Sequence, residues 1–162
     1  MVERKGKAVS LELSKSFLKN FPFLNGQFRK KSHNTGKYNC LAYAVEDEEH
    51  WWQPVPNPAL PHRYWPPGAP KTNHINSYVA ALKLEKFKKC IRPIYDRKYL
   101  TIALFEFKDM EFSHAAKLLS NGQWTSKLGD QQDIIHRTLG ALEGNQFKRG
   151  YGKAKIYMRR LR

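Results

Sequence analysis

The sequence predicts an α+β domain in which N-terminal helices pack on an antiparallel sheet of about four or five strands. Apolar residues recur at helical spacing in the first half of the chain and alternate with polar ones after Lys89. The tripeptide Ser120-Asn121-Gly122 is a hairpin signal between two of the predicted strands. With 162 residues, 41% of them hydrophobic, we expect a single domain over residues 1–162.

Each element follows from its own pattern of apolar residues. Spacings of three and four predict helices over about residues 11–20, from Cys40 towards residue 49, over about 72–87 with Thr72 as cap, and over 130–142. Alternation predicts strands over residues 90–95, 100–107, 112–119, 123–128 and 153–158. Residues 1–35 are therefore expected to form a basic N-terminal helix and loop.

The segment 51–70 is rich in proline and tryptophan and predicts a long loop without regular structure. Its aromatic side chains form the wall of a substrate cleft in one interpretation and cover the core in the other. The residues concerned are Trp51, Trp52, Tyr64 and Trp65.

The net charge is +15, and most of it lies at the two ends of the chain. Residues 1–31 and residues 143–162 each carry +6, whereas residues 46–49 are all acidic. A basic surface attracts nucleic acid, anionic polymers or lipid headgroups, and it also occurs as a solvated face with no partner.

Several classes of protein are not supported by the sequence. No apolar run approaches the roughly 20 residues of a membrane span, and no classical signal peptide is present. We therefore expect a cytoplasmic protein, or one exported by another route. The chain has no HExxH, CxxC or glycine-rich phosphate motif, so neither a metal nor a cofactor is expected.

Cys40 and His114 are the candidate catalytic pair. Cys40 is expected in the first turn of a helix, where the helix dipole lowers a thiol pKa, and His114 near the start of a strand. In a thiol hydrolase the thiolate attacks a carbonyl carbon, the imidazolium protonates the leaving group, and backbone N–H groups hold the oxyanion. The alternative interpretation involves no catalysis. In it Cys40 is a small buried hydrophobic residue and His114 is a hydrogen-bonded strand residue.

Several segments together resemble an uncharacterised bacterial domain family over roughly residues 36–160. They are Tyr38-Asn-Cys-Leu-Ala-Tyr-Ala44, Trp51-Trp52, Tyr64-Trp-Pro66, the block His114 to Gly129, His136, Tyr151-Gly152 and Met158-Arg159. The layout is similar to the NlpC-type branch of papain-like cysteine peptidases. That resemblance implies a papain-like fold, Cys40 as nucleophile, His114 as general base and acid, and a third polar residue on the next strand.

The register of the hairpin decides which residue is the third member. A two-residue loop places Lys127 on the face of His114, whereas a three-residue loop with a bulge places Ser126 there. Asp130 and Asp133 are further candidates to orient a histidine, and His136 is a candidate to approach the site. Asn34 and Gln27 are candidates to donate a side-chain N–H to an oxyanion, and the adjacent Asn39 is equally suited to cap the helix.

Two hypotheses about function result. The first is a papain-like cysteine peptidase or amidase acting on a peptide or amide substrate, with cell-wall peptide or another anionic polymer favoured by the charge; a bacterial secreted effector is one version. The second is a non-catalytic module that uses its basic ends to bind nucleic acid or an acidic protein.

Overall fold

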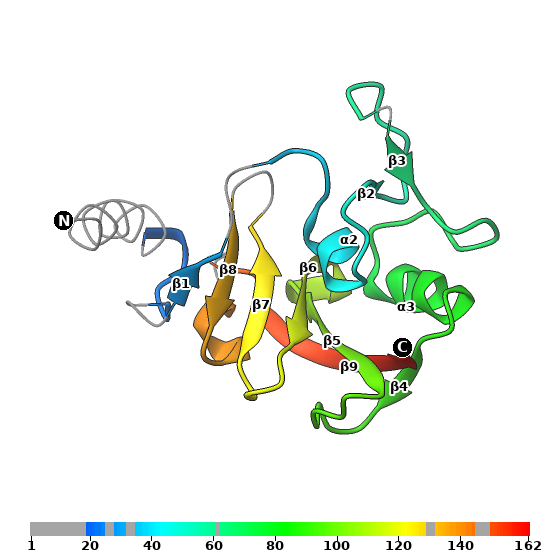
Figure 1. Cartoon of the computed structure of the whole chain (residues 1–162). Coiled ribbons are helices and arrows are strands. Elements are labelled where there is room, and N and C mark those ends of the chain that lie inside the picture. Colours follow the sequence, from blue (N-terminus) through cyan, green and yellow to red (C-terminus); the bar gives the residue numbers. More distant parts are fainter. Residues whose placement is uncertain (1–18, 25–27, 32–34, 61, 129–131, 145–149) are drawn as a thin grey trace.

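The computed structural model describes residues 19–24, 28–31, 35–60, 62–128, 132–144 and 150–162. Its main feature is a seven-stranded sheet in which every neighbouring pair is antiparallel, in the order β1-β8-β7-β6-β5-β9-β4 (Figure 1). The strands are β1 (Phe28–Lys30), β4 (Lys88–Cys90), β5 (Tyr99–Glu106), β6 (Phe112–Leu118), β7 (Trp124–Lys127), β8 (Asp133–His136) and β9 (Lys153–Leu161).

This architecture corrects the predicted fold class. The prediction was a set of N-terminal helices on four or five strands, whereas the sheet has seven, and the helices that pack on it are α2 (Cys40–Ala44) and α3 (Ile75–Leu84). Among the helices of the described residues, α3 alone is longer than two turns. The helix predicted over residues 11–20 lies almost entirely outside the described residues. The molecule is therefore mostly antiparallel β-sheet.

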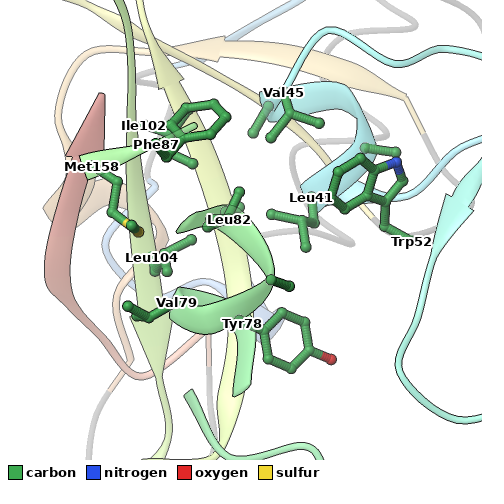
Figure 2. Close-up of a cluster of buried hydrophobic side chains, with 14 of the residues drawn as sticks. Leu41, Val45, Trp52, Tyr78, Val79, Leu82, Phe87, Ile102, Leu104 and Met158 are labelled. Carbon is green, nitrogen blue, oxygen red and sulfur yellow. The ribbon is translucent and has the colours of Figure 1, made fainter. Parts of the chain in front are cut away.

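One face of the sheet is covered by α2 and α3. Leu41 and Val45 from α2 and its C-cap meet Val79 and Leu82 from α3 over strand residues such as Ile102 (Figure 2). Leu41, Leu82 and Ile102 are completely buried. We call this face of the sheet the helical face.

The opposite face carries a second core. Phe105, Trp124 and Ile134 lie here with Leu24 and Leu142 from the segments that cross this face. Successive strand residues point to opposite faces, so Phe105 belongs to this core while Leu104, which precedes it in β5, belongs to the other. We call this the second face.

The helix predicted over residues 130–142 is a strand followed by a short turn of 3-10 helix. Asp133 to His136 form β8, and Leu139–Leu142 form the 3-10 helix η2. Ile134, Ile135, Leu139 and Leu142 are spaced as on one face of a helix, so periodicity alone predicts a single helix here. In the structure three of the four residues of β8 are buried, so the strand lacks the alternation of buried and exposed residues that identifies a half-buried strand.

The strand predicted over residues 90–95 is also wrong. β4 ends at Cys90, and residues 91–98 form a loop. Pro93 has no N–H to donate to a ladder, and Ile91 is 93% exposed instead of contributing to a core. Similarly, the cap of α3 is His74 and not Thr72, since Nδ1 of His74 accepts from the N–H of Asn76 at 3.1 Å.

The hairpin prediction is confirmed, and its register is defined. The N–H of Leu119 donates to the carbonyl of Gln123, which leaves a three-residue loop. Gly122 ends this loop with φ of +80°, a conformation that glycine adopts without strain. The strands β6 and β7 that flank the loop are antiparallel neighbours.

The segment 51–70 is largely irregular, as predicted, apart from two short strands. These are β2 (Trp51–Trp52) and β3 (Arg63–Tyr64), which pair in parallel away from the main sheet. No described helix is long and apolar enough to cross a bilayer.

Candidate functional site

Cys40 is the first residue of α2, as the sequence predicts. The side chain of Asn39 caps the helix by accepting from the N–H of Ala42 at 3.1 Å. Its Nδ2 also donates to the carbonyl of Trp52 at 2.7 Å, and the N–H of Trp52 donates back to Oδ1 at 3.2 Å. Asn39 therefore fixes the start of α2 against β2, and both ends of its amide are engaged in that task.

The thiol of Cys40 is protonated at neutral pH. Burial raises its pKa to about 11, although the N–H groups of Ala115 and Leu41 donate to the sulfur and Lys127 lies near enough to lower the pKa. A lowered pKa was predicted from the helix dipole. The helix has only five residues, and the cost of placing a thiolate among buried side chains outweighs the polar groups around it.

His114 lies on the second face, completely buried. Its ring stacks on that of Tyr151, with centroids 4.0 Å apart and planes 3° apart, and contacts the ring of Phe105 edge-on. Within the described part of the chain, neither ring nitrogen has a hydrogen-bond partner. Burial, together with the nearby His136, holds its pKa well below the usual value.

The structure thus brings Cys40 and His114 to neighbouring positions without a hydrogen bond between them. The thiol accepts from Ala115, the residue that follows His114 in β6. Ala115 belongs to the core of the helical face, and the rings packed on His114 belong to the second face. Chain alternation therefore directs the imidazole to the other side of the sheet from α2.

Ser126 shares the face of His114, which is the outcome that the three-residue loop predicts. Its hydroxyl, however, lies 2.8 Å from Nε2 of His136. Nδ1 of His136 lies 2.8 Å from the carbonyl oxygen of Thr138, which can only accept. His136 therefore carries its proton on Nδ1, and Ser126 donates to Nε2, so Ser126 supports His136 and not His114.

Lys127 lies on the helical face and is completely buried. Its ammonium is 5.5 Å from the ring centroid of Tyr38, and its Cα is opposite that of Asp133 in β8. The hydroxyl of Tyr38 donates to Oδ2 of Asp133 at 2.9 Å. The ammonium of Lys127 is close enough to the Cys40 sulfur to lower the pKa of that thiol. Gln27, Asn34 and Asp130 lie outside the described residues.

The four aromatic residues of segment 51–70 are divided between core and surface. Trp52 and Trp65 are buried, and each packs edge-on against a tyrosine, Tyr64 and Tyr78 respectively. Trp51 and Tyr64 are half-buried. The core-covering interpretation therefore describes Trp52 and Trp65.

Among the described residues, no group of three or more histidines, cysteines or acids is placed to hold a metal ion.

A cavity of about 1010 Å³ lies elsewhere, around the C-terminal end of β9. Its walls come from the end of α3, from β4, from the start of β5 and from the last residues of the chain. Six of the lining residues are basic and two are acidic. The basic residues are Lys86, Lys88, Lys89, Arg159, Arg160 and Arg162, and the acidic ones are Glu46 and Glu85. We call this the basic cavity.

The two carboxylates of the basic cavity are already engaged. Glu46 accepts from Arg162 at 2.8 and 2.9 Å and lies 3.5 Å from the ammonium of Lys117. Burial alone would raise the pKa of Glu46, but these two cations hold it below its usual value. Glu85 accepts from the hydroxyl of Tyr64 at 2.7 Å.

Arg160 is also engaged, in holding the fold together. Its guanidinium donates to the backbone carbonyls of Val45 and Glu85 and lies 4.7 Å from the ring of Phe87. The remaining cations, Lys86, Lys88, Lys89 and Arg159, form no ion pair with any carboxylate of the described residues. The sequence indicated that the chain ends are basic. It did not show that the C-terminal arginines lie beside lysines about 70 residues earlier, because only the pairing of β4 with β9 brings them together.

The chain belongs to the family described as Domain of unknown function (DUF7689), whose model matches residues 29–159. The match covers all seven strands of the sheet except the ends of β1 and β9. No curated protein and no solved structure matches the chain.

Proposed function

We propose that this domain is a non-catalytic binding module that holds an anionic ligand in the basic cavity. The observation that carries the proposal is the presence, around one cavity, of four cations that form no ion pair with a carboxylate of the described residues: Lys86, Lys88, Lys89 and Arg159. Unpaired cations of this density attract anions, and a concave site strengthens the field that they share.

The register of the edge strand supports the same proposal. Lys88 of β4 lies directly opposite Arg159 of β9. Like charges at directly opposite positions of an antiparallel pair destabilise the pair. An anion bound between the two side chains would remove this repulsion. The repulsion therefore destabilises the strand pair in the free domain but not in the complex.

Phosphate is the anionic group that the cavity fits best. A guanidinium presents a planar fork that matches two oxygens of a phosphate, and lysines add mobile point charges around it. The guanidinium of Arg159 lies 4.3 Å from the ring centroid of Tyr99, which restricts its orientation. An oriented arginine with flanking lysines is suited to a ligand that carries more than one phosphate.

The proposal is tested with a soluble probe, inositol hexakisphosphate, titrated calorimetrically into the full chain at 50 and 300 mM NaCl. The double variant Lys88→Gln/Arg159→Gln should bind at least about tenfold more weakly and with a shallower dependence on salt, because two cations are removed. The matched control is Lys71→Gln/Lys108→Gln, which removes two exposed lysines elsewhere.

Equal affinity of the cavity variant and the control would overturn the proposal and assign the binding to other basic residues. A labelled 20-nucleotide oligothymidylate, measured in parallel, separates nucleic acid from compact phosphate ligands. Binding of the oligonucleotide that survives the cavity variant would likewise place that interaction outside the cavity.

The predicted cysteine peptidase or amidase is a second candidate. What supports it is that the backbone of Ala115, the residue that follows His114, lies close enough to the Cys40 sulfur to lower the pKa of that thiol. It is tested by hydrolysis of a fluorescent peptide library by the wild type, Cys40→Ala and Cys90→Ala. Turnover lost only in Cys40→Ala would support this candidate, and the absence of turnover at any pH from 6 to 10 would exclude it for these substrates.

A further inference from the structure

The loop of residues 91–98 joins two strands that both line the basic cavity. Lys89 precedes it in β4 and Tyr99 follows it in β5. Figure 1 shows the loop at the same end of the sheet as β4 and the C-terminus. Whatever occupies the cavity is therefore close to this loop along the chain and in space.

Backbone hydrogen bonds fix the shape of this loop. The N–H of Ile94 donates to the carbonyl of Arg92, and the N–H of Tyr99 donates to that of Asp96. The N–H of Arg162 donates to the carbonyl of Lys98 and attaches the loop to the end of β9. The loop thus presents its side chains from a defined framework.

The side chains that it presents include large apolar ones. Ile91 is 93% exposed, Ile94 67% and Tyr95 39%. Leu161, at the rim of the basic cavity, is 66% exposed. Single exposed apolar residues are common on protein surfaces, but three within five residues of one loop, beside a further exposed leucine, mark an interaction site.

Cations surround these apolar side chains. Arg92, Arg97 and Lys98 are exposed in the same loop, against the single carboxylate of Asp96. The loop and the adjacent cavity therefore combine apolar tips with a positive background. This combination is complementary to an anionic bilayer, in which apolar side chains enter the acyl boundary and cations remain at the headgroups.

We propose that the domain docks on an anionic lipid surface, with Ile91 and Ile94 inserted and the basic cavity over a lipid phosphate. This inference rests on the proposed function, because it assigns the anion of the cavity to a lipid headgroup. Arg92, Arg97 and Lys98 belong to the same exposed loop as the isoleucines, so they are available to headgroup phosphates when the isoleucines are inserted.

Other partners fit the same surface less well. Nucleic acid offers phosphates to the cations but no apolar layer for two aliphatic side chains, and Ile91 and Ile94 stack poorly on bases. An acidic protein would need an apolar pocket for each isoleucine within a negative surface. A bilayer offers an apolar acyl region to the isoleucines and anionic headgroups to the cations, and it needs no specific pocket for either.

The test uses cosedimentation of the full chain with large unilamellar vesicles. One set is pure phosphatidylcholine, and the other contains 30% phosphatidylserine, at 100 mM NaCl. Wild type should bind the anionic vesicles at least about tenfold more tightly than the neutral ones, since several cations meet the surface potential. Ile91→Ser/Ile94→Ser should weaken binding to anionic vesicles about tenfold, because insertion of two aliphatic side chains is lost.

The matched control is Val55→Ser/Met110→Ser, which removes two other exposed apolar side chains and should bind as wild type does. Inositol hexakisphosphate titrations of the same variants separate this inference from the proposed function. The loop variant Ile91→Ser/Ile94→Ser should keep the wild-type affinity for the soluble probe, whereas its affinity for anionic vesicles should fall.

Each remaining outcome decides against one of the two proposals. If wild type binds the soluble probe but not anionic vesicles, or if the loop variant binds vesicles as the control does, the membrane inference is wrong and the anion-binding function stands. If wild type binds neither, the proposed function itself fails. Both isoleucines are exposed, so the loop variant is expected to fold, and its thermal midpoint serves as the check.

Discussion

The hydroxyl of Ser126 donates to Nε2 of His136 across 2.8 Å, inside the core of the second face. Both residues are completely buried, and His136 is held from its other side by the carbonyl of Thr138. A serine that was predicted to support a catalytic histidine therefore satisfies a different, buried histidine. The pair holds β7 and β8 together by side chains as well as by their backbone ladder.

Replacing Ser126 by alanine should destabilise the domain by about 1 to 3 kcal/mol, because Nε2 of His136 would be left buried without a donor. The free energy of unfolding is measured by urea titration at pH 7. Ser120→Ala, at an exposed position of the adjoining loop, is the control and should change stability by less than about 0.5 kcal/mol. Equal effects of the two substitutions would contradict the proposed importance of the bond.

Stability should fall on acidification because of the same histidine. Burial lowers the pKa of His136 from 6.5 to about 4, so the unfolded chain binds its proton first as the pH falls below 6.5. The stabilisation is complete above pH 6.5 and is lost as the pH approaches 4, amounting to about 3 kcal/mol for His136 alone. His114, with a pKa lowered in the same direction, adds to the loss.

Urea titrations between pH 7 and 4.5 measure this dependence. His136→Gln lacks the titrating group, so its stability should depend on pH less steeply over that window, whatever its stability at pH 7. An unchanged slope in this variant would show that other groups are responsible for the acid sensitivity.

Local patterns in the sequence were informative where the signal lies within a few neighbouring residues, as in a helix start, a helical stripe or a turn. The helix start at Cys40, the stripe of α3 and the hairpin of β6 and β7 are of this kind. The element β8 is not, because three of its four residues are buried and the alternation of a half-buried strand is absent. The predicted helix at that position led to the wrong fold class.

The candidate sites show a similar limit. The chemistry of a thiol hydrolase and the resemblance paired Cys40 with His114, and the structure brings the backbone of Ala115, the residue after His114, close to the Cys40 sulfur. The sequence could not show on which face of β6 the imidazole lies, since one residue of register reverses every side chain. The basic cavity depends on the pairing of Lys88 with Arg159, which are far apart in the sequence and carry no pattern that relates them.

Gly152 should tolerate no side chain. Its φ is +71°, and a Cβ at this position would lie 2.1 Å from the carbonyl oxygen of Glu106 in β5. Gly122 is the matched control, because it also has positive φ, at +80°, but has no heavy atom within 4 Å of such a Cβ. Gly122→Ala should cost about 1 kcal/mol, from backbone conformation alone.

Gly152→Ala should cost at least about 2 kcal/mol more, since the contact with Glu106 forces β9 away from β5. Thermal unfolding of the two variants measures the difference directly. Similar midpoints for Gly152→Ala and Gly122→Ala would mean that the approach of the two backbones is not important for stability.

Cys40 should react slowly with alkylating reagents in the folded protein. A thiol with a pKa of about 11 holds roughly a hundredfold less thiolate at pH 7.5 than one with the ordinary value of 9, and thiolate is the reacting species. Iodoacetamide labelling, followed by mass spectrometry of the peptide that contains Cys40, gives the rate in native protein and in 8 M urea. The native rate should be lower by about a hundredfold and should rise steeply above pH 9. A native rate equal to or faster than the unfolded one would instead reveal an activated thiolate, and it would favour the cysteine hydrolase over the binding module.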